Sequence, residues 1–413
     1  MNTSATPPHP RSLLYTVYFI YFFCGLTLCF EGAFNPEFKD YFQLSYQQQM
    51  YTMFAKNIPF VLAVGIGFLT PRLGYKNCLT TGMALFATGT LLLVPGLQSG
   101  SYAVVLAAFF IIGLGFNFQL VAGNPLLSAL GPADGRSSRL NLGNALGAIA
   151  QILGPVTLTL IIPVSVVTVQ GKLPYMKGLF TAIGALLIGI ALLTLMVRGV
   201  DVSASFRSPE AATPGSASVR ASWLQPKLLL GFVAIFLALG AEAGLFGLYR
   251  NYLEDPQIAG LTSHQSQRMF TVYFAVFALG RLVGSAVQKK IKPASTLVVG
   301  AIAALVLLGI IVTGKGALAV AAVTAIGFFV SIFFPTLYAL AIEGLGEQTA
   351  KASGLLTMGF LGCAVLPVLQ GWLADRPGLG LQHSYGLSFL AYLGVLAYAW
   401  KSWERRPETS QVP

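Results

Sequence analysis

Long apolar runs separated by short polar segments dominate the pattern of this chain. A run of about 20 apolar residues lets a helix cross the ~30 Å hydrocarbon core of a bilayer. Strand-like alternation of polar and apolar residues is absent, so the runs are predicted to be helices, which satisfy their own backbone hydrogen bonds in lipid. The pattern predicts twelve spans: Leu13–Phe34, Met50–Leu69, Cys78–Pro95, Tyr102–Leu130, Leu140–Pro163, Pro174–Val197, Leu228–Tyr252, Met269–Val287, Ser295–Val312, Leu318–Ile342, Ala352–Leu373 and Tyr385–Trp400.

The longest polar interruption, Arg198–Ser222, is rich in Ser, Ala, Pro and Gly and divides the spans six and six. Such a composition is typical of a flexible linker. We therefore predict an N-terminal six-helix half in residues 1–200, a cytoplasmic linker in residues 201–226 and a C-terminal six-helix half in residues 227–413.

The two predicted halves resemble each other in sequence. The pattern P-x-L-x-A-L occurs in the fourth span at Pro125–Leu130 and in the tenth at Pro335–Leu340. Gly154-Pro155 in the fifth span corresponds to Leu366-Pro367 in the eleventh at almost the same offset. Matches in the same order at nearly one offset indicate a duplication. Two six-helix halves related by a repeat resemble the major facilitator superfamily, in which substrate binds between the halves near the midplane.

The composition excludes an ordinary soluble protein, since 55% of the residues are hydrophobic, 9% are charged and the mean hydropathy is +0.73. The net charge of +11 follows from topology rather than from a nucleic-acid partner. With the N-terminus inside, cytoplasmic segments hold 16 Lys and Arg residues and external loops hold seven, a bias that places both termini in the cytoplasm. The seven assigned to external loops are Lys39, Lys172, Lys177, Arg250, Arg268, Lys315 and Arg376.

Metal and catalytic motifs are missing from the sequence. Cys24, Cys29, Cys78 and Cys363 fall in or at the spans without metal-ligand spacing, so we expect packing residues and no disulfide. The Walker, HExxH and nucleophile-elbow patterns are absent, and the three His lie in the tail or at loop ends. We therefore expect no enzyme, no metal and no cofactor beyond a coupling proton.

The most informative ionisable residues inside the apolar runs are Glu31, Lys56 and Glu242, and Arg281 also lies within a predicted span. A charge at bilayer depth costs about 2.5–3.5 kcal/mol on insertion scales and usually faces a bundle interior or a water cavity. Glu31 and Lys56 lie at compatible depths on neighbouring helices, which predicts an ion pair; the alternatives are a purely structural pair or snorkelling to the interface. Glu242 has no basic residue nearby in its own span and is a candidate proton carrier, with Glu31 as the second.

Uncharged polar and aromatic residues in the spans supply candidate substrate contacts. Sugars need amide or carboxylate partners for their hydroxyls, and their ring faces commonly stack on aromatic side chains. The alternative is that such residues hydrogen-bond neighbouring helices together. The candidate substrate-binding residues are Gln119, Asn124, Asn144, Gln151, Tyr249 and Tyr338. The candidates for a cytoplasmic gate, through loop acids or helix C-termini, are Arg72, Lys76, Arg139 and Lys289.

Several segments resemble the fucose–galactose–glucose:proton symporters of the major facilitator superfamily. They are GNPLLSALGP followed by SRLNLGNALGAIAQILGP, then ALGAEAGLFGLY around Glu242, SIFFPTLYALAIEGLGEQTAKASGLL, VLPVLQGWLAD and LQHSYGLSFL. The resemblance covers most of the chain. Two positions depart from it, since Glu31 lies one residue earlier relative to Pro36 than the family's acid, and Leu120 occupies the family's Gln or Glu position with Gln119 beside it.

The sequence and the resemblance together imply a twelve-helix secondary transporter that carries a hexose-like sugar with protons by alternating access. Transport of another small solute, including export, and a transporter-like sensor that moves no substrate are the alternatives. We expect a multi-pass monomer in the cytoplasmic (inner) membrane of a bacterium, with the lipid bilayer and a small-molecule sugar as its partners.

Overall fold

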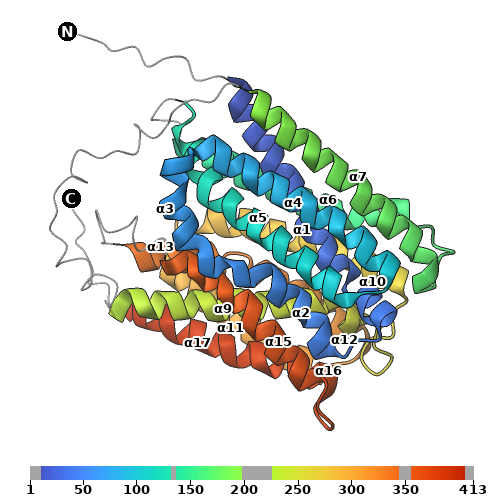
Figure 1. The fold of residues 1–413 in the computed structure, drawn as a ribbon. Coiled ribbons are helices and arrows are strands. Elements are labelled where there is room, and N and C mark those ends of the chain that lie inside the picture. The colour runs from blue at the N-terminus through green and yellow to red at the C-terminus, as the bar shows by residue number, and fades with distance from the viewer. Residues whose placement is uncertain (1–10, 132–135, 198–225, 344–354, 405–413) are drawn as a thin grey trace. The chain divides into compact units, whose positions relative to one another are not determined.

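The computed structural model describes residues 11–131, 136–197, 226–343 and 355–404 (Figure 1). Within these ranges every regular element is a helix, and strands are absent. The earlier helices are α1 (Arg11–Phe42), α2 (Tyr46–Asn57), η1 (Ile58–Leu62), α3 (Ala63–Leu73), α4 (Tyr75–Ser99), α5 (Tyr102–Ala129), α6 (Arg136–Ile161) and α7 (Val169–Met196). The later ones are α9 (Pro226–Glu254), α10 (Ser263–Val287), α11 (Pro293–Thr313), α12 (Gly316–Val330), α13 (Phe333–Ile342), η6 (Met358–Leu361), α15 (Gly362–Ala374), α16 (Gly380–Ser384) and α17 (Gly386–Glu404).

In the described ranges, 11 helical segments are long and apolar enough to cross a membrane. One of them joins α2, η1 and α3, and another joins α12 and α13. The helix α17 covers nearly all of the last predicted span, Tyr385–Trp400, and continues to Glu404. The all-helical membrane fold predicted from the sequence is therefore confirmed, and the count of twelve is broadly consistent with these elements. The predicted linker in residues 201–226 falls almost wholly outside the described residues.

Several helices continue beyond the ends predicted for them. The helix α1 runs to Phe42, so that Glu37 lies inside it, and α7 and α9 contain Lys172 and Arg250. The assignment of these two basic residues to loops was therefore wrong, because each is buried within a helix and pairs with Glu37. The side of the membrane on which they lie stays a prediction. The same correction applies to the basic residues Lys39, Lys177 and Arg268, which lie in α1, α7 and α10.

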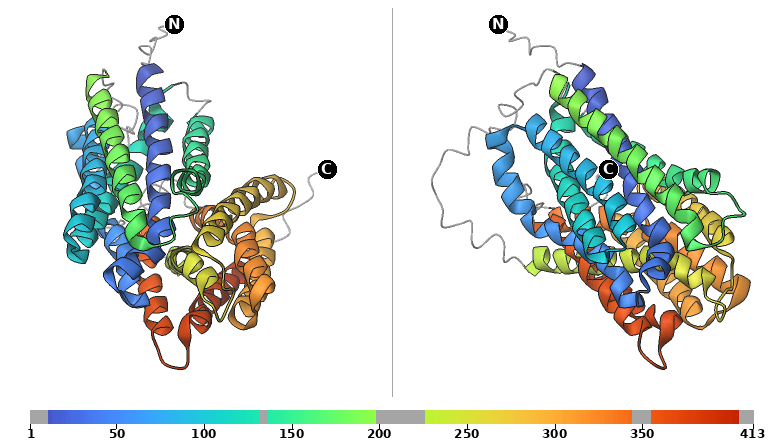
Figure 2. Two further views of the ribbon diagram at one scale, coloured as in Figure 1. Left: turned by 90° about the vertical axis from the view of Figure 1, so that its right-hand side faces the viewer. Right: turned by 45° about the vertical axis from the view of Figure 1, so that its right-hand side comes forward.

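The described residues form two compact units. The first contains residues 11–28, 62–131, 136–151 and 176–197, and the second contains residues 29–61, 152–175, 226–343 and 355–404. The second unit thus includes early segments of the chain as well as the C-terminal helices, which are drawn from yellow to red in Figure 2. The predicted division of the chain into two pseudo-symmetric halves stays a prediction.

Close helix contacts in both units depend on glycine. In the first unit, a Cβ on Gly115 of α5 would lie 2.6 Å from the Gly82 carbonyl oxygen of α4. In the second unit, a Cβ on Gly280 of α10 would lie 2.1 Å from the Phe328 carbonyl oxygen of α12. Both distances are shorter than a real contact, so these crossings exist only because the side chain is a hydrogen atom. Small residues serve the same purpose at helix interfaces in membranes generally.

The tenth predicted span is interrupted between α12 and α13. Pro335 has no N–H group, so it cannot donate to the carbonyl four residues earlier, which belongs to Ser331. The next carbonyl, that of Ile332, accepts normally from Thr336 at 3.1 Å. The P-x-L-x-A-L motif therefore leaves one backbone acceptor open at the break.

Candidate functional site

Glu242 lies in the middle of α9 in the second unit and is partly buried. It interacts electrostatically with Arg281 of α10. Its own helix offers no nearby basic residue, and this one comes from the following helix. Among the described residues no hydrogen bond or ion pair joins the two side chains, and the role of Glu242 as a proton carrier stays a prediction.

Arg281 is held in place by two contacts. Its Nε donates to the Ser331 carbonyl oxygen at 3.2 Å, and its guanidinium lies 4.8 Å from the centroid of the Phe277 ring. Pro335 leaves the Ser331 carbonyl without its helical N–H donor, and Arg281 donates to that carbonyl instead. A guanidinium has five N–H donors, and this arrangement uses one of them on the backbone. The others are available to Glu242 or to a ligand.

Two buried tyrosines lie close enough to Glu242 to interact with it electrostatically. Tyr273 of α10 and Tyr392 of α17 both interact with Glu242, and their exposed fractions are 2% and 0%. Among the described residues, neither hydroxyl has a hydrogen-bond partner. Buried polar groups are nearly always hydrogen-bonded, so such exceptions need an explanation. The two tyrosine hydroxyls near Glu242 can therefore form hydrogen bonds that no described residue of the protein uses.

Tyr249 and Tyr338, the predicted stacking residues, differ in their surroundings. Tyr249 is fully buried, and its hydroxyl shares a hydrogen bond with the Thr324 hydroxyl at 2.7 Å. Its ring centroid lies 5.0 Å from that of Tyr273, so the two rings pack against each other and Tyr249 restricts the position of Tyr273. Tyr338 is partly buried on α13, with its ring 6.0 Å from Phe334. Their roles in substrate binding stay predictions.

The four predicted amide ligands lie in the first unit, on α5 and α6. Gln119 is 2% exposed, and its Oε1 has no hydrogen-bond partner among the described residues. Asn124 accepts a hydrogen bond from the Tyr21 hydroxyl of α1 at 2.5 Å, a partner that sequence reasoning did not identify. Asn144 is exposed and Gln151 is partly buried on α6. Gln119 is thus the one whose side chain is buried with unused acceptor capacity.

The predicted pair of Glu31 and Lys56 is described only in part. Glu31 lies in α1, but its side chain is outside the described residues. Lys56 is partly buried in the last turn of α2, just before Pro59 and the 3₁₀ turn η1. The ion pair stays a prediction.

Two of the four predicted gate residues contact helix C-termini in the first unit. Lys76 donates to the carbonyls of Leu195 and Val197 at the end of α7, at 2.9 and 2.5 Å. Arg139 donates through Nε to the Leu127 carbonyl near the end of α5, at 3.0 Å. Cations are favoured at such positions because the last carbonyls of a helix carry partial negative charge. The other two candidates, Arg72 and Lys289, are exposed, and the gate itself stays a prediction.

A buried ion cluster in the second unit was missed from the sequence. Glu37 of α1 pairs with Lys172 of α7 at 2.8 Å and with Arg250 of α9 at 2.7 Å. Arg250 also pairs with Glu254 at 2.8 Å, so the cluster contains two acids and two bases. Ser263 of α10 accepts from Arg250 at 2.8 Å and from Lys172 at 2.7 Å. The cluster therefore joins four helices that are far apart in the sequence.

Comparisons with known proteins agree with this architecture. The sequence profile of the Major Facilitator Superfamily matches residues 14–360. A glucose/galactose transporter of Brucella abortus is 30% identical over 377 residues, which cover 91% of this chain and 90% of the relative. An L-fucose-proton symporter of Escherichia coli is 26% identical over 336 residues, which cover 77% and 76% of the two chains.

Solved structures show the same fold. A crystal structure of a variant of the E. coli fucose:proton symporter superposes with a TM-score of 0.68 at 22% identity, covering 94% of this chain and 98% of that one. A D-xylose-proton symporter superposes with a TM-score of 0.67 at 15% identity, covering 96% and 98%. The resemblance seen in the sequence motifs is confirmed by the profile and by the relatives. The chain belongs to the major facilitator superfamily.

Proposed function

We propose that this protein is a proton-coupled transporter that accumulates a hexose-like sugar by alternating access. The relatives are named for glucose, galactose and L-fucose, and two of them are named as proton symporters, which supports both the substrate class and the coupling ion. The observation that carries the proposal is the group around Glu242. A carboxyl inside a membrane helix lies within electrostatic range of an arginine that donates to the Ser331 carbonyl, and of two tyrosine hydroxyls with unused hydrogen-bonding capacity.

Proton coupling follows from a competition for Arg281. Ionised Glu242 attracts the guanidinium and engages its free N–H donors. When Glu242 takes up a proton, this attraction is lost, and the donors are released to the hydroxyl oxygens of a sugar. Protonation and sugar binding then favour each other, and such coupling is reciprocal by thermodynamic linkage.

The remaining predicted residues take supporting roles in this proposal. Glu31 serves as a second proton acceptor, and the amides of Gln119, Asn124, Asn144 and Gln151 remain the candidate sugar ligands of the first unit. Tyr249 holds Tyr273 in position through ring contact and supports the site indirectly. The protein works as a monomer in the cytoplasmic membrane of a bacterium, with both termini in the cytoplasm.

Reconstitution into proteoliposomes tests the proposal. An imposed gradient, with the lumen alkaline, should drive accumulation of at least one of radiolabelled glucose, galactose and fucose above its external concentration. A protonophore should abolish accumulation, and protein-free liposomes should show none. Folded, reconstituted protein that accumulates none of these sugars, or accumulates one equally well with the protonophore present, would refute proton-coupled hexose transport.

A further inference from the structure

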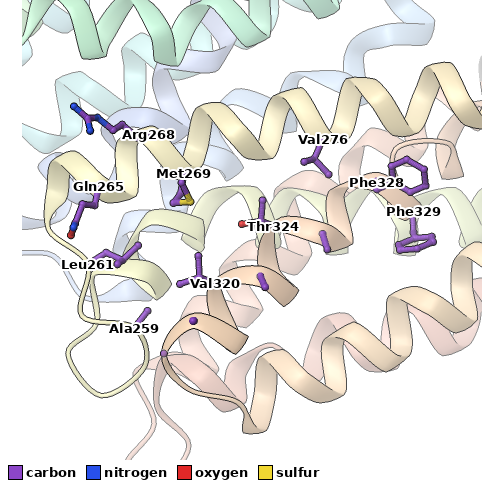
Figure 3. Close-up of a pocket in the computed structure, with 14 residues that line it drawn as sticks. Ala259, Leu261, Gln265, Arg268, Met269, Val276, Val320, Thr324, Phe328 and Phe329 are labelled. Atoms are coloured by element: carbon purple, nitrogen blue, oxygen red, sulfur yellow. The ribbon is translucent and has the colours of Figure 1, made fainter.

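A long apolar groove of about 910 Å³ lies between α10 and α12 in the second unit (Figure 3). Its walls include Met269 and Val276 from α10 and Val320, Phe328 and Phe329 from α12. The two helices touch where Gly280 meets the Phe328 backbone. Toward the start of both helices they leave a gap, because α12 presents the small side chains of its alanines there.

The groove opens on an exposed apolar surface. Ala317 and Ala321 on its wall are exposed, and the neighbouring Leu318 is 58% exposed. In a chain of membrane-spanning helices, exposed apolar side chains of this kind face acyl chains. The part of α12 that lines the groove, from Gly316 to Phe329, rises about 20 Å at ~1.5 Å per residue. One leaflet contributes about half of the ~30 Å hydrocarbon core, so the groove is long enough for an acyl chain.

Positive charge gathers at one end of this groove. Arg268 lines it near the start of α10, and in Figure 3 its side chain extends on the side of α10 away from Thr324 and Val320, while Phe328 and Phe329 lie at the other end. Lys315 is exposed and directly precedes Gly316, another lining residue. Neither cation forms an ion pair in the described part of the chain. Asp255, the acid of the preceding loop, accepts from the Gln257 backbone at 2.8 Å.

We propose that this groove is a binding site for one anionic phospholipid. An acyl chain lies along α12 as far as Phe328, and the phosphate lies between Arg268 and Lys315. Long basic side chains at the end of a membrane helix reach toward the headgroup level in this way. The apolar length explains why the ligand is a lipid, and the two cations explain why its headgroup is anionic. Neither Glu242 nor Arg281 lines the groove, and the proposal is independent of which substrate the protein carries.

Native mass spectrometry of the delipidated full-length protein, titrated with phosphatidylglycerol or phosphatidylcholine, tests the proposal. The wild-type protein should retain one phosphatidylglycerol more tightly than phosphatidylcholine. The double variant R268Q/K315Q should lose that preference by about twentyfold, since each basic residue near a membrane surface adds severalfold to anionic lipid binding. The matched control K290Q/K292Q removes two charges beyond the other end of α10 and should keep the preference.

A second variant tests the acyl part of the site. Ala321→Phe fills the groove without changing charge and should weaken retention of the bound lipid at least fivefold. Val299→Phe, at a 64% exposed position on α11 outside the groove, should leave it unchanged. Thermal unfolding of each variant separates lost binding from lost folding. Unchanged preference in R268Q/K315Q, unchanged retention in a folded Ala321→Phe variant, or a lipid-free dimer would each overturn the proposal.

Discussion

The buried ion cluster gives the sharpest stability prediction. Arg250 is 2% exposed and pairs with Glu37 and Glu254 at 2.7 and 2.8 Å. Arg250→Met keeps most of the side chain's apolar volume but removes both pairs. Breaking a buried pair by removing one partner costs about 3–5 kcal/mol, because the other charge stays buried without compensation.

Two features of the structure place the expected loss of stability at the lower end of the range of about 3–5 kcal/mol. Glu37 keeps Lys172 as a partner at 2.8 Å, so its charge is not left alone. The Glu254 side chain is 24% exposed and can recover part of its hydration. We therefore expect Arg250→Met to lower the free energy of unfolding by about 3 kcal/mol. That is roughly a hundredfold change in the ratio of folded to unfolded protein.

A double-mutant cycle with Glu37→Gln measures the pairing directly. Unfolding in mixed micelles, titrated with sodium dodecyl sulfate and followed by circular dichroism, gives the free energy for each variant. The double variant should lose about 1–3 kcal/mol less than the sum of the two single losses, since each change relieves the other's unpaired charge. Lys177→Gln, one turn and a half further along α7, is the matched control and should change stability by less than about 0.5 kcal/mol. Strictly additive losses would refute the pairing of Glu37 with Arg250.

The remaining predictions concern packing and topology. Gly280→Ala should cost about 1–3 kcal/mol in the same unfolding assay, since its Cβ would lie 2.1 Å from the Phe328 carbonyl oxygen. Gly309→Ala, where a Cβ meets nothing within 4 Å, should be neutral or slightly stabilising, and equal losses for both would contradict the close approach. A reporter active only in the cytoplasm should be active when fused after Arg406 and inactive after Gly100; the opposite pattern would invert the proposed topology.

The membrane-spanning elements were predictable because a long apolar run in lipid has one common outcome, a helix. The residues at which these helices end were less predictable from the sequence. Glu37, Lys172 and Arg250 look like residues that end a span, yet they lie inside helices because they pair with one another. That pairing depends on tertiary contacts, which hydropathy does not report.

The candidate site was likewise predictable from the sequence only in part. Glu242 stood out as an acid in an apolar run. Arg281 was identified as a basic residue within a helix, but its contact with the Ser331 carbonyl was not, because that contact depends on the break that Pro335 makes before α13. Tyr273 was a possible stacking residue, but nothing in the sequence indicated that the hydroxyls of Tyr273 and Tyr392 are buried without a partner, since tyrosine is common in such helices. Arg281, in the next span, was the sequence signal for a basic residue near Glu242.

Proton coupling through Glu242 is the central claim, and Glu242→Gln tests it most directly. Glutamine preserves the size and most of the hydrogen bonding of the side chain but cannot release a proton. In proteoliposomes, gradient-driven accumulation of the transported sugar should collapse, while equilibrium exchange of preloaded sugar should survive at least in part. Glu343→Gln, at an exposed position after α13, is the control and should accumulate sugar normally. Normal accumulation against a gradient by the Glu242→Gln variant would contradict the account.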